Sequence, residues 1–186
     1  SHADIATAAL EAGKHVLCEK PLANTVPEAR AMVEAARSAA AAGVRAMVGF
    51  NYRRVPAVTL ARQYVADGRI GTVRHVRAQY LQDWIVDPEF PLVWRLRAEE
   101  AGSGALGDIG AHIVDLTQFV AGQRLTGVNA MLETFVKQRP LPSASSGLSA
   151  SGGTEVGDVT VDDAAVFFGR LDGGALASYE ATRFAT

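Results

Sequence analysis

The sequence of 186 residues lacks several features that would mark a specialised class of protein. Cys18 is its only cysteine, which excludes a disulfide framework and a cysteine-based zinc site. No apolar run has the roughly 20 residues that a membrane-spanning helix requires. The formal net charge of −2 gives no basic footprint for nucleic acid. Since 48% of the residues are hydrophobic, we expect a soluble globular protein that has neither a membrane nor a nucleic acid as partner.

The first fifty residues alternate between helix and strand signals. We expect a helix over about residues 3–12, a buried strand at the apolar run Val16–Cys18, and a second buried strand over residues 44–50. Thr25 to Glu28 has the form of a capping box with Pro27 in the first turn, and the helix that it starts should stop near Gly43. Its inward-facing residues are expected to be Met32, Val33 and Ala36. This alternation predicts an α/β fold with a parallel sheet.

The remaining residues predict a helix followed by a set of strands. We expect a helix from Pro56 to Gly68, a strand over 73–81, an aromatic and proline-rich loop over 83–94, and a further strand over 127–137. The run 140–157 is rich in Ser and Gly, and we interpret it as a loop. Two strands follow over 161–171 and 175–183, and the link Asp172-Gly173-Gly174 predicts a hairpin.

Residues 104–115 (GALGDIGAHIVD) carry glycines at the start of a helix and an acid one turn before a histidine. At about 100° per residue, Asp108, His112 and Asp115 share one stripe, whereas the apolar residues share another. A neutral imidazole oriented by a carboxylate is suited to general base chemistry. Taken alone, the pattern favours a solvated polar face, with Asp108 placed there by capping and by the helix dipole. We expect Asp115 to face solvent or to pair with a neighbour.

Lys20 follows the predicted strand Val16–Cys18, and Pro21 ends that strand. In open α/β sheets, ligands bind at the carboxyl ends of the strands. A lysine there could polarise a hydroxyl or carbonyl oxygen, or could equally be a solvated side chain at a strand exit.

The motifs together resemble those of the Gfo/Idh/MocA family, named for glucose-fructose oxidoreductase, inositol dehydrogenase and a rhizopine-catabolism protein. Residues 13–22 (GKHVLCEKPL) resemble its lysine motif, and residues 104–115 resemble its second signature. Residues 49–56 (GFNYRRVP) resemble the passage from its nucleotide domain to its substrate domain, and the pair Trp94-Arg95 resembles a further family feature.

The resemblance implies the C-terminal part of a Rossmann-like domain over residues 1–55, followed over 56–186 by an α+β domain with a large, mostly antiparallel sheet. Residues 102–107 match Gly-x-Gly-x-x-Gly by spacing, but they precede the histidine helix instead of following a first strand, so we reject them as the dinucleotide fingerprint. We therefore expect the chain to begin within the first domain and to end within the second sheet. No signal peptide is visible at Ser1; we expect a cytoplasmic protein, with export left open.

The resemblance further implies hydride transfer between NAD or NADP and a secondary alcohol of a sugar, polyol or inositol-like substrate. Lys20, Asp108 and His112 would be catalytic, and would bind substrate with Trp94 and Arg95. The residues expected to bind the cofactor are Glu19, Lys20, Pro21, Asn51 and Arg53. Two alternatives are an NAD-dependent glycosidase-like relative and a non-catalytic sensor or scaffold on the same fold.

Several other expectations concern partners and weaker sites. Tyr80 and Trp84 could line a sugar pocket, although a core aromatic on a strand is the simpler interpretation of Tyr80. We expect no metal, because a lysine near residues 108, 112 and 115 would oppose a cation. The family likeness also implies a homo-oligomer formed through an exposed face of the second sheet.

Overall fold

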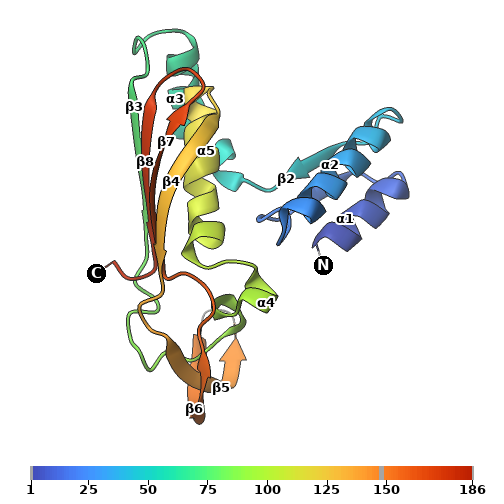
Figure 1. Ribbon diagram of the computed structural model, residues 1–186. Helices are drawn as coiled ribbons and strands as arrows, with labels where there is room; N and C mark the ends of the chain where they lie inside the picture. Colours follow the sequence, from blue (N-terminus) through green and yellow to red (C-terminus); the bar gives the residue numbers. More distant parts are fainter. Residues whose placement is uncertain (1, 147–148, 186) are drawn as a thin grey trace. The chain divides into compact units, whose positions relative to one another are not determined.

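The computed structural model describes residues 2–146 and 149–185 and divides into two compact units, Ser1–Asn51 and Tyr52–Thr186 (Figure 1). The first unit contains the helices α1 (His2–Glu11) and α2 (Val26–Ala40) and the strands β1 (Val16–Cys18) and β2 (Ala46–Val48). The two strands pair in parallel, with Val16 opposite Ala46 and Cys18 opposite Val48. The predicted βαβ alternation and parallel sheet are confirmed.

The capping box that starts α2 is also confirmed. The Glu28 N–H donates to Thr25 Oγ1 at 3.3 Å, and Glu28 Oε2 accepts from the Thr25 N–H at 2.9 Å. These reciprocal bonds satisfy two backbone donors that the first turn would otherwise leave open. A third bond, from Thr25 Oγ1 to Glu28 Oε2, adds to the lowering of the Glu28 pKa.

The expectation that both strands of this unit are buried is wrong for one of their two faces. α1 and α2 pack with the face that carries Cys18, where Ala6 and Met32 complete a small core. Side chains alternate across a strand, so Leu17 and Met47 point to the other face and are 68% and 50% exposed. Val33, expected to face inward, is also exposed, because Met32 occupies the centre of the buried stripe of α2.

The main sheet of the second unit has four strands and a helix packed against it (Figure 1). Its strands are β3 (His75–Leu81), β4 (Leu125–Glu133), β7 (Ala164–Leu171) and β8 (Leu176–Thr182), in the spatial order β3-β8-β7-β4. β3 runs parallel to β8, and the other two pairs are antiparallel. The predicted hairpin is the β7–β8 pair, and the expectation of a mostly antiparallel sheet is confirmed.

The helices of this unit include α3 (Pro56–Ala66), α4 (Ala98–Ala101) and α5 (Ala111–Ala121), together with short 3₁₀ turns η1 (Asn51–Arg54) and η2 (Trp94–Leu96). η1 begins at the last residue of the first unit. A single π-helical turn, Leu106–Gly110, leads directly into α5. The predicted helix at 104–115 is therefore π-helical over residues 106–110 and α-helical from residue 111.

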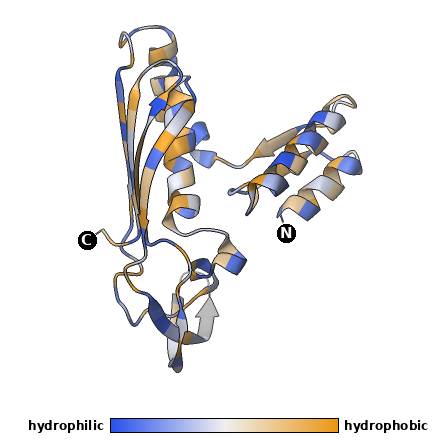
Figure 2. Ribbon diagram, viewed as in Figure 1, coloured by the Kyte–Doolittle hydropathy of each residue, from blue (hydrophilic) through white to orange (hydrophobic). Residues whose placement is uncertain are grey.

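One face of the sheet is covered and the other is open. Ile109 and Ile113 pack on Phe167 and Tyr179, whose rings stack with centroids 4.6 Å apart. Alternate residues of β4 and β7 point the other way, and Met131 there is 81% exposed. Burial accordingly alternates along β7. The hydropathy does not alternate in the same way, and hydrophobic residues recur along the strands of this sheet in Figure 2.

The interpretation of residues 140–157 as a loop is wrong. Strands β5 (Gln138–Ser146) and β6 (Ser149–Asp158) pair as an antiparallel hairpin, at the end of the unit opposite α3 in Figure 1. Residues 147–148 lie outside the described residues. Composition missed the hairpin because its support comes from the distant loop 83–94. The Leu92 N–H donates to Pro140 O, and the buried Arg139 guanidinium donates to the carbonyls of Ile85, Asp87 and Phe90.

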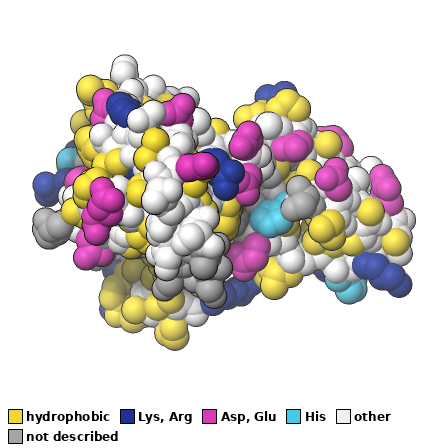
Figure 3. All heavy atoms as spheres, turned by 90° about the horizontal axis from the view of Figure 1, so that it is seen from below, with side chains coloured by type: hydrophobic (Ala, Val, Ile, Leu, Met, Phe, Trp, Pro, Cys, Tyr) yellow, Lys and Arg dark blue, Asp and Glu magenta, His cyan; other side chains and the backbone are white. Residues whose placement is uncertain are grey.

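The exposed surface carries both signs of charge. Acidic and basic side chains are interspersed over the face seen in Figure 3, and neither sign forms a continuous area there. No helix within the described residues has both the length and the hydropathy needed to cross a membrane.

Candidate active site

The histidine helix is held at its start by an acid that lies more than fifty residues later in the sequence. The buried carboxylate of Asp162 accepts hydrogen bonds from the N–H groups of Gly104 (2.8 Å) and Leu106 (2.7 Å). Its backbone carbonyl accepts from Ala105 N at 2.9 Å. These bonds satisfy donors at the start of the helical segment. The capping acid is therefore Asp162, whereas capping had been one of two interpretations of Asp108.

One glycine of this segment is required by close packing with backbone, and a second lies against a side chain. A Cβ on Gly104 would lie 1.8 Å from the Asp162 carbonyl oxygen, and a Cβ on Gly107 would lie 1.7 Å from Ser103 Oγ. The first contact is with backbone, which cannot easily yield, whereas Ser103 could rotate. The glycine pattern noticed in the sequence thus reflects how tightly the helix start packs against residue 162.

Asp108 lies in the π-helical turn, and its carboxylate is held by an arginine. Asp108 Oδ2 accepts from Arg183 Nη2 at 3.0 Å, and the Asp108 side chain stays 32% exposed while Arg183 is 1% exposed. The carboxylate thus has one oxygen fixed from the protein interior while part of the group remains open to solvent. Single π-helical turns of this kind are frequent at functional sites.

His112 lies in the first turn of α5 beside two tyrosines. Its ring centroid is 4.9 Å from that of Tyr52 and 6.1 Å from that of Tyr80. The two phenol oxygens are 2.9 Å apart, and this hydrogen bond, reinforced by burial and by negative charge at Tyr52 and Asp108, raises the pKa of Tyr80 to about 12. Tyr80 is half-buried at the edge of the site. Because its pKa is raised, its phenol stays a neutral hydrogen-bonding group near pH 7.

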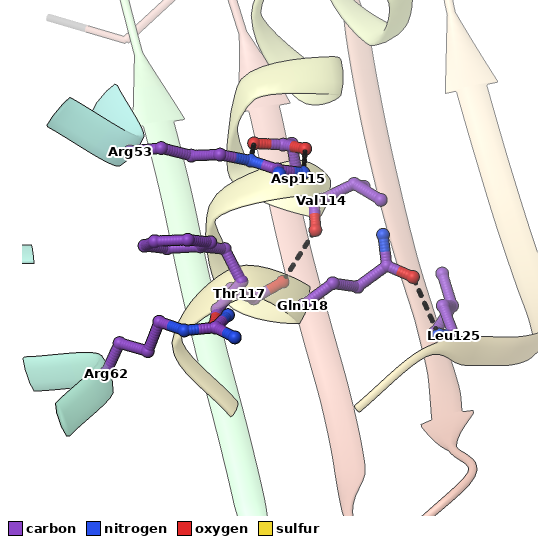
Figure 4. Close-up of polar contacts among 8 residues, drawn as sticks. Arg53, Arg62, Val114, Asp115, Thr117, Gln118 and Leu125 are labelled. Carbon is purple, nitrogen blue, oxygen red and sulfur yellow. Dashed lines mark hydrogen bonds and ion pairs between the residues drawn. The ribbon is translucent and has the colours of Figure 1, made fainter. Parts of the chain in front are cut away.

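Asp115 pairs with a neighbour, which confirms one of its two expected states and excludes solvent exposure. Arg53 donates to both carboxylate oxygens of Asp115, with Nε 2.8 Å from Oδ2 (Figure 4). This bond raises the pKa of Arg53 further. A second arginine, Arg62 of α3, donates to the carbonyl of Phe119 at 2.6 Å and lies over its ring. α5 is thus tied to the segment that starts the second unit.

Trp94 and Arg95 lie together on η2. The Arg95 guanidinium lies 4.4 Å from the centroid of the Trp94 ring, which is about half exposed. The Arg95 carbonyl faces inward and accepts from Arg183 Nη1 at 3.4 Å. Arg183 therefore contacts both Asp108 and the backbone of the Trp94-Arg95 pair.

The candidate residues of the first unit gather at one edge of its sheet. Glu19, Lys20 and Pro21 follow β1, and Asn51 follows β2, so all four lie beyond the carboxyl ends of parallel strands. The Gly49 N–H extends the ladder by donating to Cys18 O at 2.7 Å. A Cβ on Gly49 would lie 3.2 Å from Glu19 Oε1, so the Glu19 carboxyl group lies close to this backbone.

This edge fits the nicotinamide end of a dinucleotide by its chemistry. In open α/β sheets, nucleotides bind beyond the carboxyl ends of the strands. Lys20 and Asn51 supply a cationic donor and an amide there, and Glu19 supplies an acceptor. The residues present therefore suit a polar ring with a carboxamide and a ribose beside it.

Comparisons with known proteins place the two units in one family. Residues 58–186 match the sequence profile of the GFO/IDH/MocA C-terminal domain, and residues 1–50 match that of an oxidoreductase family with an NAD-binding Rossmann fold. The chain belongs to the Gfo/Idh/MocA family. The resemblance carried by the lysine motif and the histidine helix is confirmed.

Individual relatives of this family member are sugar oxidoreductases. The chain is 46% identical over 185 residues to levoglucosan dehydrogenase of Pseudarthrobacter phenanthrenivorans, which is 98% of this chain and 46% of that protein. Among solved structures, an oxidoreductase domain protein from Kribbella flavida matches with 72% identity and a TM-score of 0.93, over 100% of this chain and 48% of that one. Levoglucosan dehydrogenase bound to NADH and L-sorbose matches with 46% identity and a TM-score of 0.89, over 99% and 46%.

The chain thus spans about half the length of these relatives. The structure brings Asp108, His112 and Tyr80 together in the second unit, whereas in the first unit Lys20 and Asn51 each follow one of the two parallel strands. Sequence reasoning missed Tyr52, Asp162 and Arg183. Tyr52 could have been noticed next to Arg53 in the resembling segment, whereas no local pattern marks the other two.

Proposed function

We propose that the protein transfers a hydride reversibly between a nicotinamide cofactor and a secondary alcohol of a sugar or related polyol. The observation that carries this proposal is the arrangement at the start of α5. An imidazole and a carboxylate lie there on a tightly held helical segment, and the carboxylate is anchored by a buried arginine. Membership of an oxidoreductase family and 46% identity to a sugar dehydrogenase support it.

The proposed roles follow from what changes at the reacting alcohol: its carbon loses a hydride, its hydroxyl loses a proton, and negative charge develops on its oxygen. The bound nicotinamide supplies a hydride acceptor or donor. His112 accepts the hydroxyl proton during oxidation and returns it during reduction. Lys20 binds the reacting oxygen and stabilises its developing negative charge. Asp108 orients the histidine or receives hydrogen bonds from substrate hydroxyls.

We propose that Glu19, Lys20, Pro21 and Asn51 hold the nicotinamide end of NAD or NADP. Their position beyond the carboxyl ends of β1 and β2 supports this assignment. The Arg53 guanidinium is bound to Asp115. Arg53 would therefore support the cofactor site by holding its own segment in place.

The proposed substrate surface includes Trp94 and Arg95. A half-exposed indole offers an apolar face for a sugar ring, and the guanidinium above it offers donors to hydroxyl oxygens. Levoglucosan is the first compound to test, because the relative that shares 46% of residues is named for it.

We also propose the domain limits 1–55 and 56–186, whose boundary falls between the two profile matches, which cover residues 1–50 and 58–186. A homo-oligomer would form through the open face of the sheet. That proposal rests on four exposed apolar side chains that share this face: Met131, Val166, Phe168 and Leu176.

Steady-state kinetics of a family-length protein containing this chain test the activity. His112→Ala should lower kcat for sugar oxidation by about 10²- to 10⁴-fold and leave the Kd for NADH nearly unchanged, because the imidazole moves a proton and does not hold the cofactor. His75→Ala, which removes an exposed histidine on β3, is the matched control.

The alternatives predict different outcomes. A glycosidase-like enzyme would cleave a glycoside without net NADH formation, and a sensor would bind NADH but oxidise no sugar in a broad panel. Equal losses of turnover and cofactor affinity in His112→Ala would contradict the proton-transfer role.

A further inference from the structure

Arg183 is a buried cation that contacts two parts of the proposed site from the protein interior, the Asp108 carboxylate and the Arg95 carbonyl. It follows β8 directly, and its backbone N–H donates to Asp163 O at 3.0 Å, which fixes where its side chain starts. Its side chain is 1% exposed. Burying a guanidinium is costly unless its donors are paired, so its partners matter for the fold and for the site.

The guanidinium contacts three groups. Nη2 donates to Asp108 Oδ2 at 3.0 Å, Nη1 donates to the Arg95 carbonyl at 3.4 Å, and the guanidinium carbon lies 5.4 Å from the centroid of the Trp84 ring. The planar fork is rigid, so holding the Arg95 carbonyl restricts the direction in which the other nitrogen presents its donor to Asp108.

The surrounding charges do not replace this contact. Asp163 is another buried acid nearby, and its Oδ2 accepts from the N–H groups of Phe135 and Val136; burial raises its pKa, while these bonds and the charges of Arg139 and Arg183 oppose that rise. The other fully buried arginine, Arg139, donates to backbone carbonyls of residues 85–90. Arg183, whose side chain is 1% exposed, thus forms an ion pair with the Asp108 carboxylate from the interior.

We propose that Arg183 is a positioning residue for the reaction, an inference that rests on the proposed function. It fixes the orientation of the Asp108 carboxylate one turn before His112, and it ties that carboxylate to the backbone of the Trp94-Arg95 pair. Arg183 itself stays behind the site, so its effect on turnover passes through Asp108.

The two buried arginines provide a matched pair for testing this role. Arg183→Gln and Arg139→Gln each remove a buried cation, but only the first removes the partner of Asp108. Arg183→Lys keeps the charge and folds more readily, yet one ammonium group cannot reproduce the fork that spans Asp108 and the Arg95 carbonyl. All assays use a family-length protein below the lowest melting temperature of the variants.

The first readout is independent of turnover. The side-chain carboxyl resonance of Asp108, recorded by ¹³C NMR without cofactor and assigned with Asp108→Asn, should move in Arg183→Gln. It should move less in Arg183→Lys and stay in place in Arg139→Gln. An unchanged resonance in Arg183→Gln would overturn the proposal.

The second readout is kinetic. Arg183→Gln should lower kcat by about 10- to 100-fold, as expected when a reacting group is misplaced by about 1 Å, and by more than Arg139→Gln does. Combined with Asp108→Asn it should cause no further loss, because both changes act on one carboxylate. Independent, multiplying losses would overturn the proposal. If the parent protein oxidises no sugar, the proposed function fails, and the resonance alone then decides whether Arg183 positions Asp108.

Discussion

Removal of the Asp162 carboxylate should destabilise the start of the histidine helix. The perturbation is Asp162→Ala, which leaves the N–H groups of Gly104 and Leu106 without the acceptor that lies 2.8 and 2.7 Å away. A hydrogen bond to a charged group contributes about 1.5–3 kcal/mol, and a buried donor left unpaired carries its own cost. The bond from Ala105 N to the Asp162 carbonyl survives, because it involves the backbone.

We expect Asp162→Ala to lower the free energy of unfolding of the second unit by about 3–5 kcal/mol, a large part of the stability of a typical domain. Asp162→Asn should cost about half as much, because its one amide oxygen can still accept one of the two bonds.

Urea unfolding followed by tryptophan fluorescence measures this quantity. Trp84 and Trp94 are the two tryptophans of the chain, and both belong to the second unit, so the signal reports that unit. Asp158→Ala removes an exposed acid nearby and should change stability by less than about 0.5 kcal/mol.

Amide hydrogen exchange provides a local measurement. Protection of Gly104 and Leu106 should fall more than protection of β7 in Asp162→Ala, because the cap is lost first. A cost below about 1 kcal/mol, with both amides still protected, would refute the capping argument.

Three further predictions concern packing, titration and thiol reactivity. Gly104→Ala should destabilise the second unit by about 1–3 kcal/mol or more, because its Cβ would lie 1.8 Å from the Asp162 carbonyl oxygen. The control in the same urea assay is Gly127→Ala, whose Cβ would meet nothing within 4 Å. The raised pKa of Tyr80 means that, above pH 10, the folded state keeps a proton that the unfolded state loses. The contribution of Tyr80 to stability should therefore be complete below pH 10 and fall as the pH rises toward 12. Tyr52→Phe should shrink this fall in pH-dependent unfolding, and an unchanged fall would exclude the phenol pair as its cause. Burial and the charge of Glu19 raise the pKa of Cys18. Its thiol should therefore react slowly with a disulfide reagent at pH 8 in the native protein and rapidly in urea. Fast labelling of the native protein would contradict the burial of this residue.

The local elements follow from short-range patterns in the sequence. The capping box at Thr25 and the hairpin after β7 depend on residues within a few positions of one another, so they can be predicted without knowing the fold. The lysine motif and the glycine-framed histidine helix likewise carried the family resemblance. The open faces of the sheets, where Leu17 and Met131 lie, could not be assigned, because an apolar side chain alone does not tell which face of a strand another element covers.

The sequence by itself therefore determined the family, the order of most of the elements, and the acid, the histidine and the lysine of the proposed site. Only the tertiary structure decided what holds those groups in place. Asp162 caps the helix at Gly104 and Leu106 from more than fifty residues away, and Arg183 reaches Asp108 from the end of β8. Buried charges must find partners wherever the fold places them, and such long-range pairing leaves no periodicity or spacing in the sequence.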